Sequence, residues 1–225
     1  MSVASKSTIE QRALRIPVGP ATLDADLSLP ASATGLVLFA HGSGSSRFSS
    51  RNRHVARQLN DAGLATVLAD LLTPAEEAVD ERTRQLRFDI QLLAQRLVGA
   101  TDWLAAHPRT GRLPIGHFGA STGAGAALVA AAQRPDTVQA VVSRGGRPDL
   151  AAESLAQVRA PTLLIVGGDD VPVIGLNEQA LARLPSEKKL VIVPGATHLF
   201  EEPGALDQVA VLARDWFLRW LPKPP

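Results

Sequence analysis

The chain has 225 residues, of which 45% are hydrophobic and 20% are charged, as expected for a globular protein with one substantial core. Its 23 Lys and Arg residues balance 22 Asp and Glu residues, and the basic residues are scattered, so the sequence gives no support for nucleic-acid binding. The absence of cysteine excludes disulfides, a thiolate nucleophile and cysteine-ligated metal centres, and it is compatible with a cytoplasmic location. We expect a single domain over residues 1–225.

The two ends of the sequence show no pattern of a targeting or membrane segment. Residues 1–10 lack a basic stretch followed by a long apolar run, so we expect no secretory signal. No stretch of the chain reaches the ~20 apolar residues of a membrane span. Residues 1–12 and 222–225 are predicted to be poorly ordered ends.

The predicted elements begin with two strands, 13–18 and 21–29, which Gly19-Pro20 joins into a hairpin at a sheet edge. The apolar run 35–40 is typical of a strand that is covered on both faces. Helices and strands then alternate. The expected helices are 53–62, 81–106, one after Ser121, 150–157, 174–184 and 205–221, and the expected strands are 64–72, one before Ser121, 138–143, 162–166 and 189–193. This alternation predicts an α/β fold with a mostly parallel sheet and helices on both faces.

The pentapeptide Gly119-Ala120-Ser121-Thr122-Gly123 is the first candidate for chemistry. It follows an apolar stretch that predicts a strand and precedes an alanine-rich stretch that predicts a helix. Small residues two before and two after a serine suit a nucleophile elbow, because that strand-to-helix turn is strained and crowded. The backbone N–H of Thr122 would then lie at a helix N-terminus, where a developing negative charge is stabilised. The alternative is a tight glycine turn before a packed helix.

A serine hydroxyl is a weak nucleophile at neutral pH and needs a base, for which the sequence offers five histidines. His198 follows the last predicted strand in a glycine-containing loop, where this type of sheet presents catalytic groups. It also comes after Ser121 in the chain, in the order serine, acid, histidine. The other four are assigned structural roles: a core residue inside a strand for His117, loop support for His41, and solvated helix positions for His54 and His107.

The acid that orients this base is expected where the strand 162–166 ends in Gly167-Gly168-Asp169-Asp170. Because adjacent side chains at a strand end point in opposite directions, one of the two carboxylates is expected to face His198. Either aspartate fits from position alone, and the other would be solvated or would cap the following helix.

The loop His41-Gly42-Ser43-Gly44-Ser45-Ser46 directly follows the strand 35–40. This is the place where a nucleophile elbow finds the second donor of its oxyanion hole. We expect the backbone N–H of Ser43 to pair with that of Thr122 in stabilising an oxyanion. An ordinary Gly/Ser loop is the alternative.

Five arginines fall close to the expected site. Arg144 and Arg147 follow the strand 138–143, and Arg47, Arg51 and Arg53 follow the Gly/Ser loop. A guanidinium group offers a planar fork to a carboxylate, and our hypothesis assigns substrate binding to Arg144. Surface salt bridges or loop anchoring are the alternative roles.

From about residue 13 to 221 the chain resembles α/β-hydrolases, and within them the dienelactone hydrolase family. The resemblance rests on the segments 41–46, 119–123, 167–170 and 195–198. It implies an open sheet of about eight strands and favours Asp170 over Asp169 as the acid. The segments 71–77 and 143–150 are similar to those of a small bacterial subgroup, some of whose members resemble domains joined to phosphoribosyltransferases.

The sequence thus predicts a serine esterase. Ser121 replaces the cysteine of dienelactone hydrolase proper, which favours carboxylic esters over lactones. No metal or cofactor is expected. The segment 144–161 holds one short predicted helix and no room for a lid domain, so we expect an open site, small to medium acyl groups and no interfacial activation. Thioester or lactone hydrolysis is the alternative among enzymes, and a non-catalytic binding protein is the alternative of another class.

Overall fold

The computed structural model describes residues 8–221 of the chain. The predicted loose ends at residues 1–7 and 222–225 lie outside this range. The prediction was wrong for residues 9–12, because β1 begins at Ile9 and pairs along its whole length with β2, for example Ile9 with Pro30 and Arg12 with Leu27. Ladder hydrogen bonds therefore hold this stretch to the sheet.

Eight strands form one sheet in the order β1-β2-β4-β3-β5-β6-β7-β8. The hairpin of β1 and β2 lies antiparallel at one edge, and the pairs from β4 to β8 are parallel. The central strands are buried along their full length because helices cover both faces, which explains their continuous apolar runs. The strand bounds are β1 Ile9–Val18, β2 Ala21–Pro30, β3 Gly35–Ala40, β4 Leu64–Ala69, β5 Ile115–Ala120, β6 Val138–Arg144, β7 Thr162–Gly167 and β8 Lys188–Val193.

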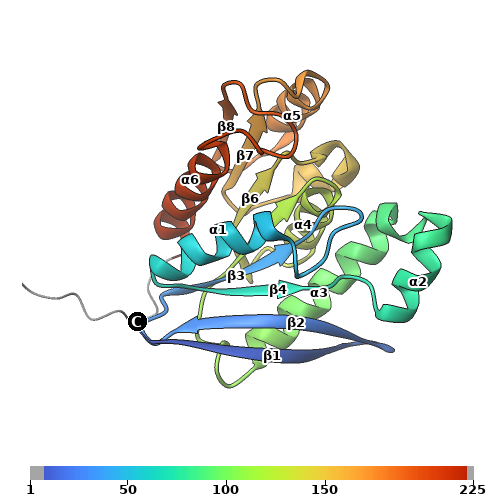
Figure 1. Cartoon of the computed structure of the whole chain (residues 1–225), viewed down its shortest axis with the longest axis vertical. Coiled ribbons are helices and arrows are strands. Elements are labelled where there is room, and N and C mark those ends of the chain that lie inside the picture. Colours follow the sequence, from blue (N-terminus) through green and yellow to red (C-terminus); the bar gives the residue numbers. More distant parts are fainter. Residues whose placement is uncertain (1–7, 222–225) are drawn as a thin grey trace, which may run out of the picture.

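Helices cover the sheet on both faces and enclose two hydrophobic cores (Figure 1). Side chains of α1 and α6 pack in one core, and those of α3, α4 and α5 pack in the other. The helix bounds are α1 Ser50–Asp61, α2 Pro74–Thr83, α3 Ile90–Ala106, α4 Thr122–Gln133, α5 Val171–Arg183 and α6 Ala205–Trp220, with short 3-10 helices η1 Leu86–Phe88 and η2 Pro148–Gln157. The predicted α/β architecture is confirmed.

The long helix predicted over 81–106 was wrong. The chain instead forms α2, ends it at Arg84 in the left-handed conformation (φ 54°), and starts α3 anew with Asp89 as the N-cap. Thr73 and Glu76 form a capping box at the start of α2, and Pro74 occupies its first turn. The capping box and Pro74 can be recognised in the sequence. They start a separate helix, α2, in the connection between β4 and β5.

Two other boundaries bear on the site. Strand β4 ends at Ala69 rather than at residue 72, so Asp70, Leu71 and Leu72 lie in the loop beyond it. Helix α5 begins at Val171 rather than at residue 174, which makes Asp170 its N-cap residue. Between β6 and β7 the chain forms η2, a 3-10 helix that buries Ala151 and Leu155 against the core.

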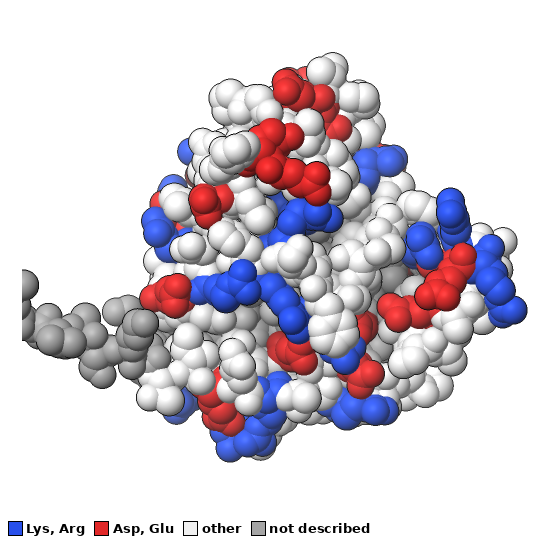
Figure 2. Space-filling view, viewed as in Figure 1, with Lys and Arg blue, Asp and Glu red and all other residues white. Residues whose placement is uncertain are grey.

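Basic and acidic side chains are interspersed over the face of the molecule that Figure 2 shows. None of the helices within residues 8–221 combines the length and apolar character needed to cross a membrane.

Candidate active site

The turn between β5 and α4 holds Ser121 in a strained backbone conformation, with φ 50° and ψ −122°. A non-glycine residue with positive φ is uncommon and marks sites that the surrounding structure holds in place. The flanking glycines explain how the turn fits: a Cβ on Gly119 would lie 2.4 Å from Cα of Ala124, and a Cβ on Gly123 would lie 2.3 Å from the carbonyl oxygen of Ala40. The strand and helix approach so closely that both positions require glycine.

Three side chains from three different loops meet beside this turn. Nδ1 of His198 lies 2.6 Å from Oδ2 of Asp170, and Nε2 of the same ring lies 3.4 Å from Oγ of Ser121. The Asp170 side chain is 12% exposed and that of His198 is 38% exposed, so the carboxylate is shielded and the imidazole faces the open site. The arrangement is a chain of contacts from carboxylate to imidazole to hydroxyl.

The structure distinguishes between the two adjacent aspartates. Asp170 is the N-cap residue of α5, yet its side chain makes no capping hydrogen bond and contacts His198 instead. Asp169 is exposed, and its backbone N–H donates to the carbonyl of Ala196. Of the two carboxylates, the structure places that of Asp170 in the site.

Two other histidines are buried where the sequence predicted structural roles. His117 is fully buried between the hydroxyl of Thr101 (2.9 Å) and the carbonyl of Ala127 (3.4 Å), and burial lowers its pKa to about 4. Nε2 of His41 accepts a hydrogen bond from the backbone N–H of Leu71 (3.1 Å), which ties the loop after β3 to the loop after β4. Burial lowers the pKa of His41, against smaller opposing effects of the Gly42 carbonyl and Asp70.

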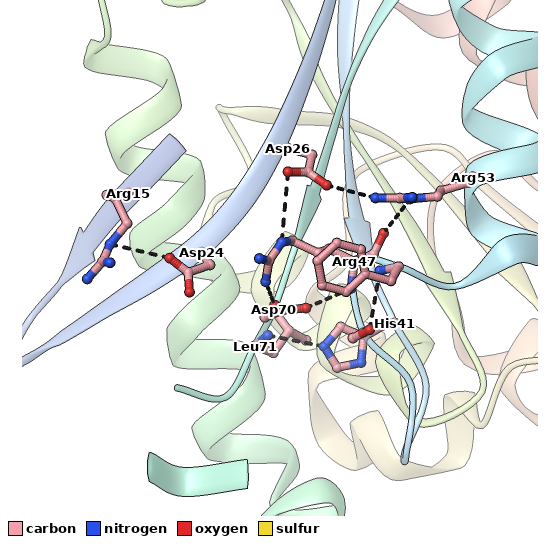
Figure 3. A network of polar contacts seen from close by, with 10 residues as sticks. Arg15, Asp24, Asp26, His41, Arg47, Arg53, Asp70 and Leu71 are labelled. Carbon is pink, nitrogen blue, oxygen red and sulfur yellow. Dashed lines mark hydrogen bonds and ion pairs between the residues drawn. The ribbon is translucent and has the colours of Figure 1, made fainter. Parts of the chain in front are cut away.

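Asp70 holds the far end of the same loop (Figure 3). Its carboxylate accepts a hydrogen bond from the backbone N–H of Arg47 (2.6 Å) and pairs with the guanidinium of that residue. Asp26 on β2 adds an ion pair with Arg53 at 3.1 Å, and Arg53 donates to the carbonyl of Arg47 at 3.2 Å. We call residues 41–47 the oxyanion loop, after the role expected of Ser43. Contacts near both ends of this loop fix its position.

The backbone N–H of Ser43, predicted as an oxyanion donor, lies at the elbow. It donates to Oγ1 of Thr122 at 2.9 Å. The structure thus places Ser43 beside Thr122, and the contact between them is made by the Thr122 hydroxyl, for which the sequence predicted no role.

A pocket of about 310 Å³ lies beside Thr122 and the oxyanion loop. Its walls are the oxyanion loop and Thr122 on one side and the segment from Leu72 to the start of α3 on the other. The second wall was not predicted, because its residues from 81 onward were expected to form one continuous helix and α2 was not expected. The residues from this wall are Leu72, Glu77, Asp80, Glu81, Arg87 and Leu93.

The five arginines near the site differ in their partners. Four of them form ion pairs: Arg47 with Asp70, Arg51 with Glu201, Arg53 with Asp26 and Arg147 with Asp149. Within residues 8–221, Arg144 has no acidic partner, although it is only 7% exposed. Its guanidinium reaches the side-chain oxygen of Asn52 at 3.5 Å, and burial, with a contribution from nearby Arg51, lowers its pKa to about 10.

The described residues contain no cluster of three His, Asp or Glu side chains that could hold a metal ion. The site instead holds a hydroxyl, an imidazole and a carboxylate, which are groups of nucleophilic and acid–base chemistry.

The mostly parallel eight-stranded sheet, with a serine at a strand–helix elbow and a histidine in the loop after the last strand, defines an α/β-hydrolase fold. Residues 23–220 match the dienelactone hydrolase family, and the chain belongs to this family. It is a hydrolase.

Two proteins of high sequence identity match this chain over different shares of their own lengths. The crystal structure of a dienelactone hydrolase from Anabaena variabilis is 64% identical, with a TM-score of 0.94, and the match covers 95% of this chain and 99% of that one. A putative phosphoribosyl transferase of Mycobacterium tuberculosis is 56% identical over 224 residues. The match covers all of this chain but half of that relative, so the chain spans about half the length of the curated relatives it matches most fully.

The fold extends to a structure of much lower sequence identity. Est1E from Butyrivibrio proteoclasticus is 17% identical with a TM-score of 0.77, and the match covers 92% of this chain and 98% of Est1E. At this identity the likeness concerns the fold alone.

Proposed function

We propose that the protein is a serine esterase that cleaves carboxylic esters of small to medium acyl groups. The observation that carries the proposal is the continuous contact from Asp170 through His198 to Ser121. Ser121 attacks the ester carbonyl, and His198 accepts its proton and returns it to the leaving alcohol. Asp170 orients the imidazole and stabilises its protonated form, and water then releases the acid from the acyl-enzyme.

The reaction in this form uses only groups of the chain itself and needs no cofactor or metal. The ring contact at Nδ1 directs Nε2 toward the serine, as a general base requires. The 3.4 Å separation between Nε2 and Oγ is longer than a strong hydrogen bond, and such contacts shorten when a substrate binds.

The pocket supports small substrates. Its volume of about 310 Å³ is at the lower end of the range for small-molecule sites. Val171 and Leu199 directly follow Asp170 and His198 and are 68% and 40% exposed, which provides apolar surface for an acyl or alkyl group. We therefore propose an ester with a short apolar portion.

Arg144 remains our candidate for a substrate carboxylate. Its carbonyl accepts a hydrogen bond from the backbone N–H of Ser121 (3.2 Å), so it is a direct neighbour of the nucleophile in the sheet. A buried guanidinium is ordinarily paired, and the lack of an acidic partner within residues 8–221 favours an anion supplied by the substrate. Arg144 lies outside the lining of the pocket described above, so this carboxylate would occupy a different part of the site.

Lactone hydrolysis is the second candidate function. The similar protein from Anabaena variabilis carries the name dienelactone hydrolase, and its identity to this chain is 64%. A lactone is an internal ester, and the same nucleophile, base and oxyanion donors would open it. Thioesters undergo the same acyl transfer and are a further alternative.

Labelling with a fluorophosphonate probe tests the proposal directly. The wild-type protein should be modified at Ser121, and Ser121→Ala should keep the fold, lose the label and lose ~10³-fold or more of turnover. A panel of matched esters, thioesters and lactones then ranks the three substrate classes. A protein that acts only by binding a partner would leave Ser121 unlabelled and every substrate intact, which would overturn the proposal.

A further inference from the structure

The contact between Ser43 and Thr122 joins the two residues whose backbone amides were expected to form the oxyanion hole. The Ser43 N–H donates to Oγ1 of Thr122 at 2.9 Å, across 79 positions of sequence. The Ser43 amide hydrogen therefore points at a side-chain oxygen. The backbone N–H of Thr122 is the first of helix α4, and a helix supplies no internal acceptor for its first N–H groups.

The hydroxyl of Thr122 has a hydrogen left to donate. A threonine hydroxyl carries one hydrogen and two lone pairs, and the Ser43 N–H uses one lone pair. Among residues 8–221 no group accepts a hydrogen bond from Oγ1 of Thr122. Thr122 is 3% exposed, yet it lines the pocket beside Gly42 and Ser43.

We infer that the side-chain hydroxyl of Thr122 donates a hydrogen bond to the oxyanion that forms when Ser121 attacks a carbonyl. Thr122 then supplies two donors, its backbone N–H and its O–H. Ser43 acts through Oγ1: its amide positions the hydroxyl and polarises it, which strengthens the bond that the hydroxyl donates. No proton leaves Thr122 in this step. The inference rests on the proposed function and identifies a further residue of the same site.

The surroundings fit a fixed donor. Thr122 is β-branched, which restricts its χ1, and it lies in the first turn of a buried helix. The Ser43 amide is held in turn by the oxyanion loop, which the His41–Leu71 and Arg47–Asp70 contacts tie to the end of β4. A donor positioned before the reaction stabilises the developing charge without reorganisation.

Two substitutions separate the hydroxyl from the rest of the side chain. Thr122→Val removes the hydroxyl and keeps the branched shape, and Thr122→Ser keeps the hydroxyl and removes the methyl group. We expect Thr122→Val to lower kcat about 10²-fold with little change in KM. Thr122→Ser should retain most of the wild-type kcat. If Thr122→Val does not fold, the pair Thr122→Ala and Thr122→Ser makes the same comparison.

A transition-state analogue gives a readout that a packing role would not move. A trifluoromethyl ketone that matches the best ester captures Ser121 as a hemiketal oxyanion, whereas the corresponding secondary alcohol binds without forming one. Thr122→Val should weaken inhibition by the ketone by about the same factor as it lowers kcat/KM and should leave binding of the alcohol unchanged.

Three results would overturn the inference while leaving the esterase proposal intact. One is a Thr122→Val enzyme with unchanged kcat. Another is a Thr122→Val enzyme with higher kcat, which would mean that Oγ1 only accepts the Ser43 N–H and keeps it from the oxyanion. The third is an equal loss in Thr122→Val and Thr122→Ser, which would assign the effect to packing. A wild-type protein that neither hydrolyses esters nor reacts with fluorophosphonate would instead overturn both proposals.

Discussion

The carboxylate of Asp170 lies 2.6 Å from Nδ1 of His198, on the side of the ring opposite Ser121. The pairing sets the tautomer of the imidazole, because the nitrogen that faces the carboxylate keeps its hydrogen. In the proposed mechanism the other nitrogen is then free to accept the serine proton. Asp169 gives a control with the same charge one position earlier in the chain.

Asp170→Asn should lower kcat by up to ~10⁴-fold, because an amide at this position permits the wrong tautomer of His198. Asp169→Asn should leave kcat close to that of the wild-type enzyme, since its exposed side chain does not reach the imidazole. Steady-state kinetics with one good ester measure both. Equal losses in the two variants would contradict the assignment of the acid.

Gly123→Ala should destabilise the fold and the elbow together. The added Cβ would lie 2.3 Å from the carbonyl oxygen of Ala40 and 2.4 Å from that of His41, and backbone atoms at these positions yield only if β3 and α4 separate. Overpacking of this kind costs about 1–3 kcal/mol of unfolding free energy or more.

Gly175→Ala on helix α5 is the matched control, because a Cβ there meets no atom within 4 Å. Alanine is favoured over glycine in a helix by about 0.5–1 kcal/mol, so this variant should be as stable as wild type or more stable. Denaturant unfolding of both variants, with ester turnover, checks the pair. A Gly123→Ala protein of wild-type stability would show that the elbow is less tightly packed than the structure indicates.

Arg144→Met tests recognition of a substrate carboxylate. The ratio of kcat/KM for a dicarboxylic half-ester to that for the neutral ester of equal length should fall about 10-fold or more, the loss expected for a charged hydrogen bond. Methionine keeps much of the buried volume, and replacing an unpaired buried charge by an apolar group need not destabilise the fold. Arg147→Met is the control, since Asp149 pairs with that guanidinium. An unchanged ratio in Arg144→Met removes Arg144 from substrate recognition.

The free energy of unfolding should fall as the pH falls from about 6.5, the ordinary pKa of histidine, toward 4. In this window the unfolded chain binds a proton at His117, but the folded chain does not, because burial lowers its pKa to about 4. The unfolded state therefore binds more protons and is favoured at acid pH, and above pH 6.5 both states are neutral and the effect is absent. His41 acts in the same direction.

For His117 the effect amounts to at most about 3 kcal/mol between the two pKa values. His117→Leu removes the titration, and the hydroxyl of Thr101 keeps its bond to the carbonyl of Leu97. Urea unfolding at several pH values should show a flatter stability profile for this variant. A profile that matches that of the wild type would assign the acid sensitivity to other groups.

Ester hydrolysis should follow simple saturation as the substrate concentration crosses its solubility limit. Between β6 and β7 the chain forms only the 3-10 helix η2 and its flanking loops, and the His198 side chain is 38% exposed. When the site is already open, the rate of hydrolysis does not rise at the surface of substrate droplets. Rates measured across the limit check this, and a sharp rise at the onset of droplets would indicate a part of the chain that closes the site.

The sequence by itself determined the order of the strands, and it placed the residues proposed as nucleophile and base after the strands that precede them. Continuous apolar runs indicate strands that are covered on both faces, and Gly119 and Gly123 around Ser121 indicate a crowded turn, so both are patterns that short stretches of sequence carry. The single helix 81–106 was mispredicted, although the capping box at Thr73 that starts α2 is also a local pattern. The regularly spaced apolar residues of α3 dominated that prediction.

Only the tertiary structure decided which groups meet. Asp169 and Asp170 are chemically alike, and the turn into α5 alone brings the second carboxylate to His198. Likewise, Arg144 differs from the other four arginines near the site only in the groups that pack around it. The Thr122 hydroxyl reaches Ser43 only because the loops after β3 and β5 lie side by side. Hydrogen bonds and ion pairs act over a few ångströms. Residues that are far apart in the sequence come this close only because the whole sheet packs around them.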